Sequence, residues 1–136
     1  MKKFLMISVL CGLAGCASLP FGGPRAASTP ATPVFFQPFS AALDAPALTT
    51  IASVAQEAKE KPGTRVTVTG AADSVGSSKA NKDLSQTRAQ VVADALVSDG
   101  VAPGRIHTRA IGIAPSHAAY GTPAQYARRA LIQVGN

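Results

Sequence analysis

Arg88 lies within the apolar face of a predicted helix, so a fold that buries this face must also accommodate a guanidinium. At about 100° per residue, Arg88 shares a face with Leu84, four residues before it, and Val91, three residues after it. A buried guanidinium without a partner costs several kcal/mol or more, so an anionic group has to meet it. Asp73 is one candidate, through an internal ion pair. A carboxylate ligand held in a bidentate fork is the other.

The first 15 residues have the features of a bacterial secretion signal. Lys2 and Lys3 precede an apolar run, Phe4–Leu13, that is much shorter than the roughly 20 residues of a membrane span. The sequence L-A-G-C that ends at Cys16 resembles the lipobox of bacterial lipoproteins. This resemblance implies that the signal is removed in front of Cys16 and that the cysteine is lipidated.

The residues after Cys16 indicate where such a lipoprotein would reside. Lipoproteins retained in the inner membrane carry an acidic residue directly after the cysteine, whereas this chain has Ala17 and Ser18. The resemblance therefore implies an outer-membrane anchor, stabilised by about 0.8 kcal/mol per buried acyl methylene. An ordinary signal, cut near Ala14 or Ala17, is the alternative. Cys11 is expected to leave with the signal, which removes a free thiol from the mature protein.

Charge and composition argue against nucleic acid as a partner. The loss of Lys2 and Lys3 with the signal leaves 11 basic residues against 7 acidic ones, a net charge of +4. The basic residues are scattered, and the chain has two tyrosines and no tryptophan to interleave with them. A mild positive charge is compatible with an anionic polymer such as a cell wall.

Residues 16–33 are predicted to form a tether, and residues 34–136 a single folded domain. The tether is rich in Pro, Gly, Ala, Ser and Thr, so it cannot bury a core and should be extended. At about 3.1 Å per residue, it could hold the domain up to roughly 50 Å from a lipid surface.

Apolar periodicity predicts alternating strands and helices across the domain. Helical spacing marks Ala45–Lys61 and Lys79–Asp99, and β-branched alternation over Arg65–Thr69 predicts a strand that stops at Gly70. Further strands are predicted at residues 34–36, 105–111 and 130–134, and a loop with a short helical piece at residues 120–126. This order predicts an α/β (α+β) sandwich, in which a mixed four-stranded sheet carries the helices on one face.

A group of motif residues resembles the OmpA C-terminal-like domain. It consists of Gly70, Asp73 and Gly76, followed by N-x-x-L-S-x-x-R-A from Asn81 to Ala89. This peptidoglycan-associated module occurs in Pal lipoproteins and in other outer-membrane and motor proteins. The likeness extends over about Val34 to Val134, and the lipobox independently supports a Pal-like arrangement. It implies a lipoprotein that links the outer membrane to the cell wall.

The resemblance also implies a ligand and its binding residues. Members of the family bind the peptide stem of peptidoglycan noncovalently, especially its diaminopimelate residue. Asp73 matches the aspartate that would receive the ligand ammonium, and Arg88 matches the arginine that would clamp the ligand carboxylate. Asn81 would help to fix the peptide, and Arg128 matches the first arginine of an N-R-R motif near the site. A ligand that carries an ammonium and a carboxylate on one carbon needs one anion and one cation at a short separation.

The chain departs from the family pattern around this site. Ala71 and Ala72 stand where the family has histidine and threonine, and Gln37 stands where it has an aspartate. Ala127 and Leu131 replace a usual asparagine and a usual glutamate. The missing charge at Gln37 is expected to weaken ammonium binding by about 1–3 kcal/mol, as for a charge-assisted hydrogen bond.

Catalysis, a metal site and a cofactor are not expected. The serine-rich loop lacks the S-x-x-K spacing, and no lysine follows Gly76 as a phosphate loop would require. His107 and His117 are isolated, and His107 is expected at the surface or edge of its strand. The competing hypothesis is a domain that docks on Tol-type or other envelope proteins. In that case Asp73 and Arg88 would form only a structural salt bridge.

Overall fold

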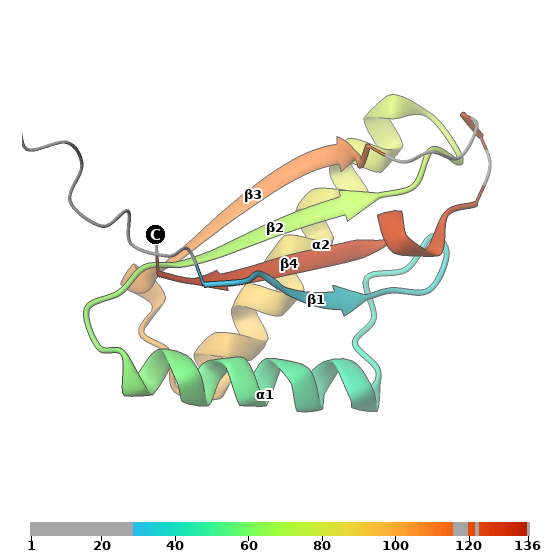
Figure 1. Ribbon diagram of the computed structural model, residues 1–136. Coiled ribbons are helices and arrows are strands. Elements are labelled where there is room, and N and C mark those ends of the chain that lie inside the picture. Colours follow the sequence, from blue (N-terminus) through green and yellow to red (C-terminus); the bar gives the residue numbers. More distant parts are fainter. Residues whose placement is uncertain (1–28, 116–119, 122, 136) are drawn as a thin grey trace, which may run out of the picture.

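Four strands form one mixed sheet, and both helices pack on the same face of it (Figure 1). The computed structural model describes residues 29–115, 120–121 and 123–135. The strand order is β1-β4-β2-β3, with β2 and β3 parallel and both other pairings antiparallel. The elements are β1 (Thr32–Phe35), α1 (Ala45–Glu60), β2 (Val66–Ala72), α2 (Ser78–Ser98), η1 (Pro103–Arg105), β3 (Ile106–Ile113), η2 (Gln125–Ala127) and β4 (Arg129–Val134).

These strand directions give the molecule two distinct ends. Strands β1, β2 and β3 terminate at the same end of the sheet, and β4 begins at that end (Figure 1). We call this end of the sheet the strand-exit end, and the opposite end, where β2 and β3 begin, the strand-entry end. Helix α2 starts from the loop that follows β2, so its first half lies near the strand-exit end.

Side-chain caps and a glycine turn fix the helix ends. The carboxylate of Asp44 accepts a hydrogen bond from the backbone N–H of Ala47 at 2.9 Å at the start of α1. The hydroxyl of Ser77 accepts one from the N–H of Ala80 at 3.1 Å at the start of α2. Helix α2 ends in a Schellman turn with Gly100 at φ +99°, a backbone conformation that only glycine adopts without cost.

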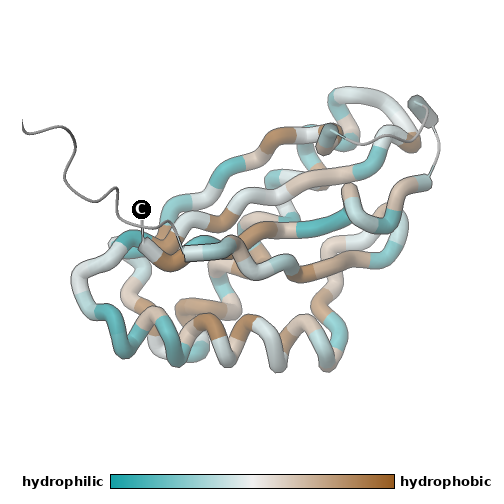
Figure 2. Tube along the Cα trace, viewed as in Figure 1, coloured by the Kyte–Doolittle hydropathy of each residue, from teal (hydrophilic) through white to brown (hydrophobic). Residues whose placement is uncertain are grey.

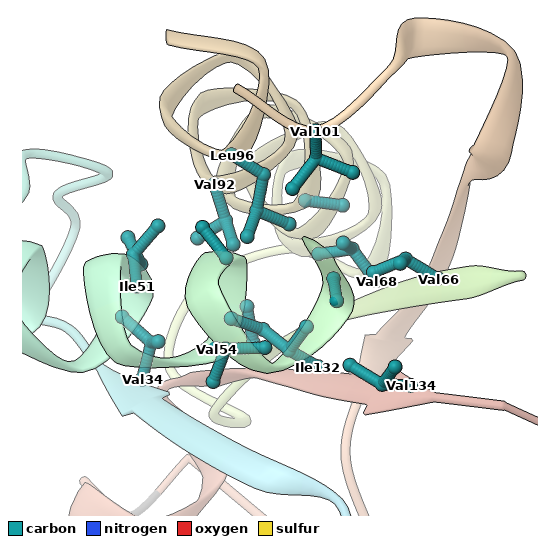
Figure 3. Close-up of a cluster of buried hydrophobic side chains, with 14 of the residues drawn as sticks. Val34, Ile51, Val54, Val66, Val68, Val92, Leu96, Val101, Ile132 and Val134 are labelled. Atoms are coloured by element: carbon teal, nitrogen blue, oxygen red, sulfur yellow. The ribbon is translucent and has the colours of Figure 1, made fainter. Parts of the chain in front are cut away.

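The hydrophobic core lies between the helices and the covered face of the sheet. Figure 3 shows aliphatic side chains of α1, α2 and the strands converging in this layer. In Figure 2, helix α1 alternates between hydrophobic and hydrophilic residues, as expected for a helix with one buried face. Its buried residues are Ala47, Ile51, Val54, Ala55 and Ala58.

The buried face of α2 changes character along its length. Its second half contributes Val92 and Leu96 to the core, whereas its first half buries Asn81, Ser85 and Arg88. Buried polar groups need partners, because an unsatisfied one costs about 1–3 kcal/mol. The polar half of α2 therefore marks the region where the fold depends on specific hydrogen bonds.

Gly70 lies where the backbones of β2 and α2 are in close contact. A Cβ atom at this position would be 1.9 Å from the backbone oxygen of Ser85, so any side chain would force the two elements apart. The strand predicted to stop at Gly70 instead continues to Ala72, with Gly70 still paired to Ala130 of β4 and Ala110 of β3. The glycine is a contact point between layers and not a strand terminator.

The other predicted elements are present with small shifts at their ends. The fold class is confirmed: a four-stranded mixed sheet with two helices on one face. Strand β1 begins at Thr32, so its first two residues fall in the range predicted as tether. His107 lies exposed on the edge strand β3, as predicted. The predicted signal, Cys16, most of the tether and His117 lie outside the described residues. No helix in the described part of the chain is long and apolar enough to cross a bilayer.

Candidate functional site

Three charged side chains gather at the strand-exit end, and we call them the charged cluster: Asp73, Arg88 and Arg128. Asp73 follows the last residue of β2, and Arg128 precedes the first residue of β4. Arg88 reaches them from the middle of α2. Because β2 and β4 are antiparallel neighbours, the end of one and the start of the other lie side by side.

The guanidinium of Arg88 is fully buried, with an exposed fraction of 0%. Nε donates to the backbone oxygen of Ser40 at 2.8 Å, Nη1 to that of Ala71 at 2.9 Å, and Nη2 to that of Gln37 at 3.0 Å. The guanidinium carbon also lies 5.1 Å from the centre of the Phe36 ring, a cation–π distance. Backbone carbonyls therefore satisfy three of the five N–H donors of Arg88.

The ion pair between Asp73 and Arg88, one of the two candidates that the sequence left open for Arg88, does not form. Among the described residues, Asp73 pairs with Arg128, whose Nη1 lies 3.1 Å from Oδ2 of the carboxylate. The expectation that an anionic group must contact Arg88 was wrong, because backbone carbonyl oxygens accept its hydrogen bonds. A planar fork of N–H donors can be satisfied by several carbonyl oxygens, and these leave no mark in the sequence. Asp73 acts on Arg88 only through its charge.

The pKa of Arg88 is lowered to about 10, first because burial disfavours the charged form. The charge of Asp73 acts to raise it and the charge of Arg128 acts to lower it. Because a pKa of about 10 is still far above neutrality, Arg88 remains a cation at physiological pH. The cluster thus holds two positive charges and one negative charge.

Arg128 is the more accessible of the two arginines. Its side chain is 12% exposed, and that of Asp73 is 9% exposed. Nε of Arg128 donates to the backbone oxygen of Phe36 at 3.3 Å, and Nη1 is committed to Asp73. Nη2 has no hydrogen-bond partner among the described residues, and it is not fully buried. Nη2 of Arg128 therefore keeps some solvent-exposed surface.

Asn81 and Ser85 hold the surroundings of the cluster in place. Nδ2 of Asn81 donates to the backbone oxygen of Val75 at 3.1 Å, which fastens the loop after Asp73 onto α2. The hydroxyl of Ser85 donates to the backbone oxygen of Lys82 and accepts from the N–H of Gly112 at 2.9 Å. Sequence reasoning included Ser85 in the motif from Asn81 to Ala89 but gave it no role, although a serine three residues before a buried arginine on the same helix face is a usable signal.

All four residues predicted to bind a ligand, Asp73, Asn81, Arg88 and Arg128, lie at the strand-exit end. Sequence reasoning did not find the carbonyls of Gln37 and Ser40, which belong to a turn closed by a 3.3 Å hydrogen bond between these two residues. Across residues 29–115, 120–121 and 123–135, no three His, Cys, Asp or Glu side chains gather as a metal site would require.

Comparison with known proteins places this site in a family. The model of the OmpA family matches residues 35–130, which include every residue of the charged cluster. The chain belongs to the OmpA family.

Two relatives extend this comparison. The chain is 38% identical over 101 residues to a probable lipoprotein of Escherichia coli K12, YiaD, which covers 74% of this chain and 46% of the relative. It is 38% identical over 81 residues to the peptidoglycan-binding protein ArfA of Mycobacterium tuberculosis, covering 60% of this chain and 25% of the relative. The chain thus spans less than half the length of either relative.

Solved structures with the same fold include a lipoprotein and a domain of MotB. The peptidoglycan-associated lipoprotein of Burkholderia pseudomallei superposes with a TM-score of 0.67 at 27% identity, covering 75% of this chain and 88% of the other. The C-terminal domain of MotB from Helicobacter pylori superposes with a TM-score of 0.65 at 20% identity, covering 77% of this chain and 86% of the other. The second likeness shows the shared fold alone.

Proposed function

We propose that this domain binds peptidoglycan noncovalently and that the chain is an outer-membrane lipoprotein linking that membrane to the cell wall. The observation that carries the proposal is the charged cluster, with an accessible Arg128 at the strand-exit end of an OmpA-family fold. Support comes from the relatives named for peptidoglycan binding or association, ArfA and the Burkholderia lipoprotein.

The ligand group we propose is the diaminopimelate of the stem peptide. Its carboxylate and ammonium are complementary in charge to the arginines and the aspartate of the cluster. Arg128 and Asp73, the two partly accessible members, would face the ligand. Arg88 would fix the turn at Gln37 and Ser40 that borders the site, and Asn81 would fix the loop after Asp73.

The membrane anchor in this proposal is an acylated Cys16, followed by the extended tether. The match to the lipoprotein YiaD supports it. Metabolic labelling with radioactive palmitate should label the wild-type chain and not the Cys16→Ser variant. On a density gradient, the label should appear in the outer-membrane fraction. Labelled protein in the inner-membrane fraction would contradict the proposed localisation.

The test of wall binding is co-sedimentation with purified sacculi. The chain from Ala17 to Asn136 keeps every helix and strand of the domain, so it is suited to this experiment. We expect it to pellet with sacculi and to be released by free diaminopimelate. Release by 1,5-diaminopentane, which has the two amines without the carboxylates, at the same concentration, or no pelleting at all, would contradict a specific diaminopimelate site.

A second candidate function is docking on an envelope protein, for example of the Tol type. The observation that favours it is an exposed aromatic pair, Phe35 and Tyr126, which are 40% and 77% exposed. Their rings meet edge to face at a centroid distance of 6.3 Å. Substitution of both by serine would weaken a protein complex and leave pelleting with sacculi unchanged.

A further inference from the structure

Phe39 has a backbone conformation that is unfavourable for its side chain. Its φ angle is +54°, and it is the only non-glycine residue with a positive φ in the described part of the chain. Most residues other than Gly, Asn and Asp avoid this left-handed region, because Cβ comes too close to the backbone. The sequence thus places a bulky aromatic residue where a glycine or an asparagine would fit at a lower cost.

The turn that contains Phe39 accounts for the positive φ. The N–H of Ser40 donates to the backbone oxygen of Gln37 and closes the turn, in which Pro38 is second and Phe39 third. Proline at the second position and a positive φ at the third are features of a type II turn, which favours glycine at its third position. The turn therefore sets this conformation, and the aromatic side chain is not needed to produce it.

The ring of Phe39 contributes little to the fold in return. Phe39 is 71% exposed, and neither of the buried hydrophobic clusters in the described part of the chain includes it. Phe36, just before the turn, is buried instead, with its ring 5.1 Å from the guanidinium carbon of Arg88. Residues in unfavourable backbone conformations gather at binding sites, and an exposed aromatic ring is a contact surface.

The turn is anchored beside the charged cluster. Nη2 of Arg88 donates to the backbone oxygen of Gln37 and Nε to that of Ser40, so one guanidinium holds both ends of the turn. The backbone oxygen of Phe36, directly before the turn, accepts from Nε of Arg128. These contacts keep the turn in place against its backbone strain and put the exposed ring at the border of the cluster.

We infer that Phe39 is an apolar contact for the ligand, and that its ring packs against the methylene chain of diaminopimelate. This inference rests on the proposed binding of the stem peptide and adds a residue to that site. The charged cluster can hold a charged end of the ligand but gives its hydrocarbon part no apolar surface, which an exposed aromatic ring does. Diaminopimelate has methylene groups between two charged ends, so it fits a site with both kinds of surface.

Three substitutions separate the ring from the backbone strain. Phe39→Asn and Phe39→Gly remove the ring and suit the positive φ, whereas Phe39→Leu keeps an apolar side chain in the unfavourable conformation. Affinity for purified sacculi is measured by pelleting the chain from Ala17 to Asn136 over a range of sacculus concentrations. Phe39→Asn and Phe39→Gly should weaken binding by about 10-fold, and Phe39→Leu by less than about 3-fold.

Urea unfolding of the same variants distinguishes a ligand contact from a structural role. The urea midpoint of Phe39→Asn should equal or exceed that of the wild type, because strain is relieved and no buried contact is lost. A lower midpoint together with weaker binding would make the ring structural and overturn the inference. As a matched control, Leu48→Ala removes an apolar side chain from α1 that is 49% exposed, and it should bind sacculi like the wild type.

Competition assigns the contact to the hydrocarbon part of the ligand. Free norleucine and free alanine both carry an ammonium and a carboxylate on one carbon, but only norleucine has a methylene chain. Norleucine should release the wild-type chain from sacculi at a lower concentration than alanine does. The two should be equally effective against Phe39→Asn. A preference for norleucine that persists in Phe39→Asn would place the hydrocarbon contact elsewhere and overturn the inference.

Failure of this inference and failure of wall binding give different results. If the wild type pellets with sacculi and Phe39→Asn pellets equally well, the inference is overturned and wall binding stands. A wild-type chain that does not pellet overturns both.

Discussion

Two arginines clamp backbone carbonyls at opposite ends of the molecule, and their surroundings differ. At the strand-exit end, Arg88 donates to three carbonyl oxygens from the turn after β1 and from β2. At the strand-entry end, Arg105 donates to the oxygens of Thr64, Ala58 and Lys61 at 2.8, 2.8 and 3.0 Å. Both side chains join segments that are far apart in the sequence. Arg105 also meets the oxygens at the end of α1, where a cation is favourable.

The two ends differ in the charged groups that surround the clamping arginine. The strand-exit end adds a second cation, Arg128, and an anion, Asp73, and leaves one nitrogen of Arg128 open. None of the ion pairs among the described residues includes Arg105. Carbonyl clamping alone is therefore a structural device.

The largest effect should come from loss of the buried clamp. Arg88→Ala would leave the oxygens of Gln37, Ser40 and Ala71 without their donor and open a cavity under Phe36. We expect the free energy of unfolding in urea to fall by about 3–5 kcal/mol. A loss below about 1 kcal/mol would show that these carbonyls find other partners and that Arg88 is free to serve a ligand.

The matching change at the other end should cost less and leave binding intact. Arg105→Ala removes four hydrogen bonds, but its partly exposed position lets water replace some of them. The free energy of unfolding should fall by about 1–3 kcal/mol in the same urea titration. The fraction that pellets with sacculi should equal that of the wild type. A loss of pelleting by folded Arg105→Ala would remove the distinction between the two ends.

The smallest effect is the coupling between Asp73 and Arg128. A double-mutant cycle with Asp73→Asn and Arg128→Gln should give a coupling energy of about 1 kcal/mol, because a single hydrogen bond of 3.1 Å joins the two side chains. The cycle of Asp73→Asn with Arg105→Ala should give about zero, since these residues lie at opposite ends of the sheet. Coupling energies of similar size in both cycles would indicate that the substitutions alter the whole fold and that no local ion pair is being measured.

Much of the fold could be predicted because local patterns and packing agree. The alternation over Arg65–Thr69 and the apolar spacing of α1 match their positions in the sheet and the helix layer. Gly70 was misinterpreted, because a glycine that ends a strand and a glycine that admits a neighbouring helix look alike in sequence. Only the 1.9 Å approach of a Cβ to the backbone of Ser85 distinguishes them.

The predicted site residues lie at the same end of the sheet, but their hydrogen-bond partners could not be predicted from the sequence. The helical position of Arg88 indicated its burial, and the structure agrees. Its partners are main-chain oxygens of Gln37, Ser40 and Ala71. The direction of a backbone carbonyl cannot be predicted from the pattern of side chains. The pairing of Asp73 with Arg128 joins residues 55 positions apart through the β2–β4 pairing, which the element order alone does not specify.

The most direct test of the account compares the two ends in one pelleting experiment. Wild type, Arg128→Gln and Arg105→Gln are each incubated with purified sacculi and centrifuged, after thermal unfolding has shown all three to be folded. The account predicts that wild type and Arg105→Gln pellet, and that Arg128→Gln stays in the supernatant. Pelleting of Arg128→Gln to the wild-type level, or wild type that stays in solution at roughly tens of micromolar, would contradict it.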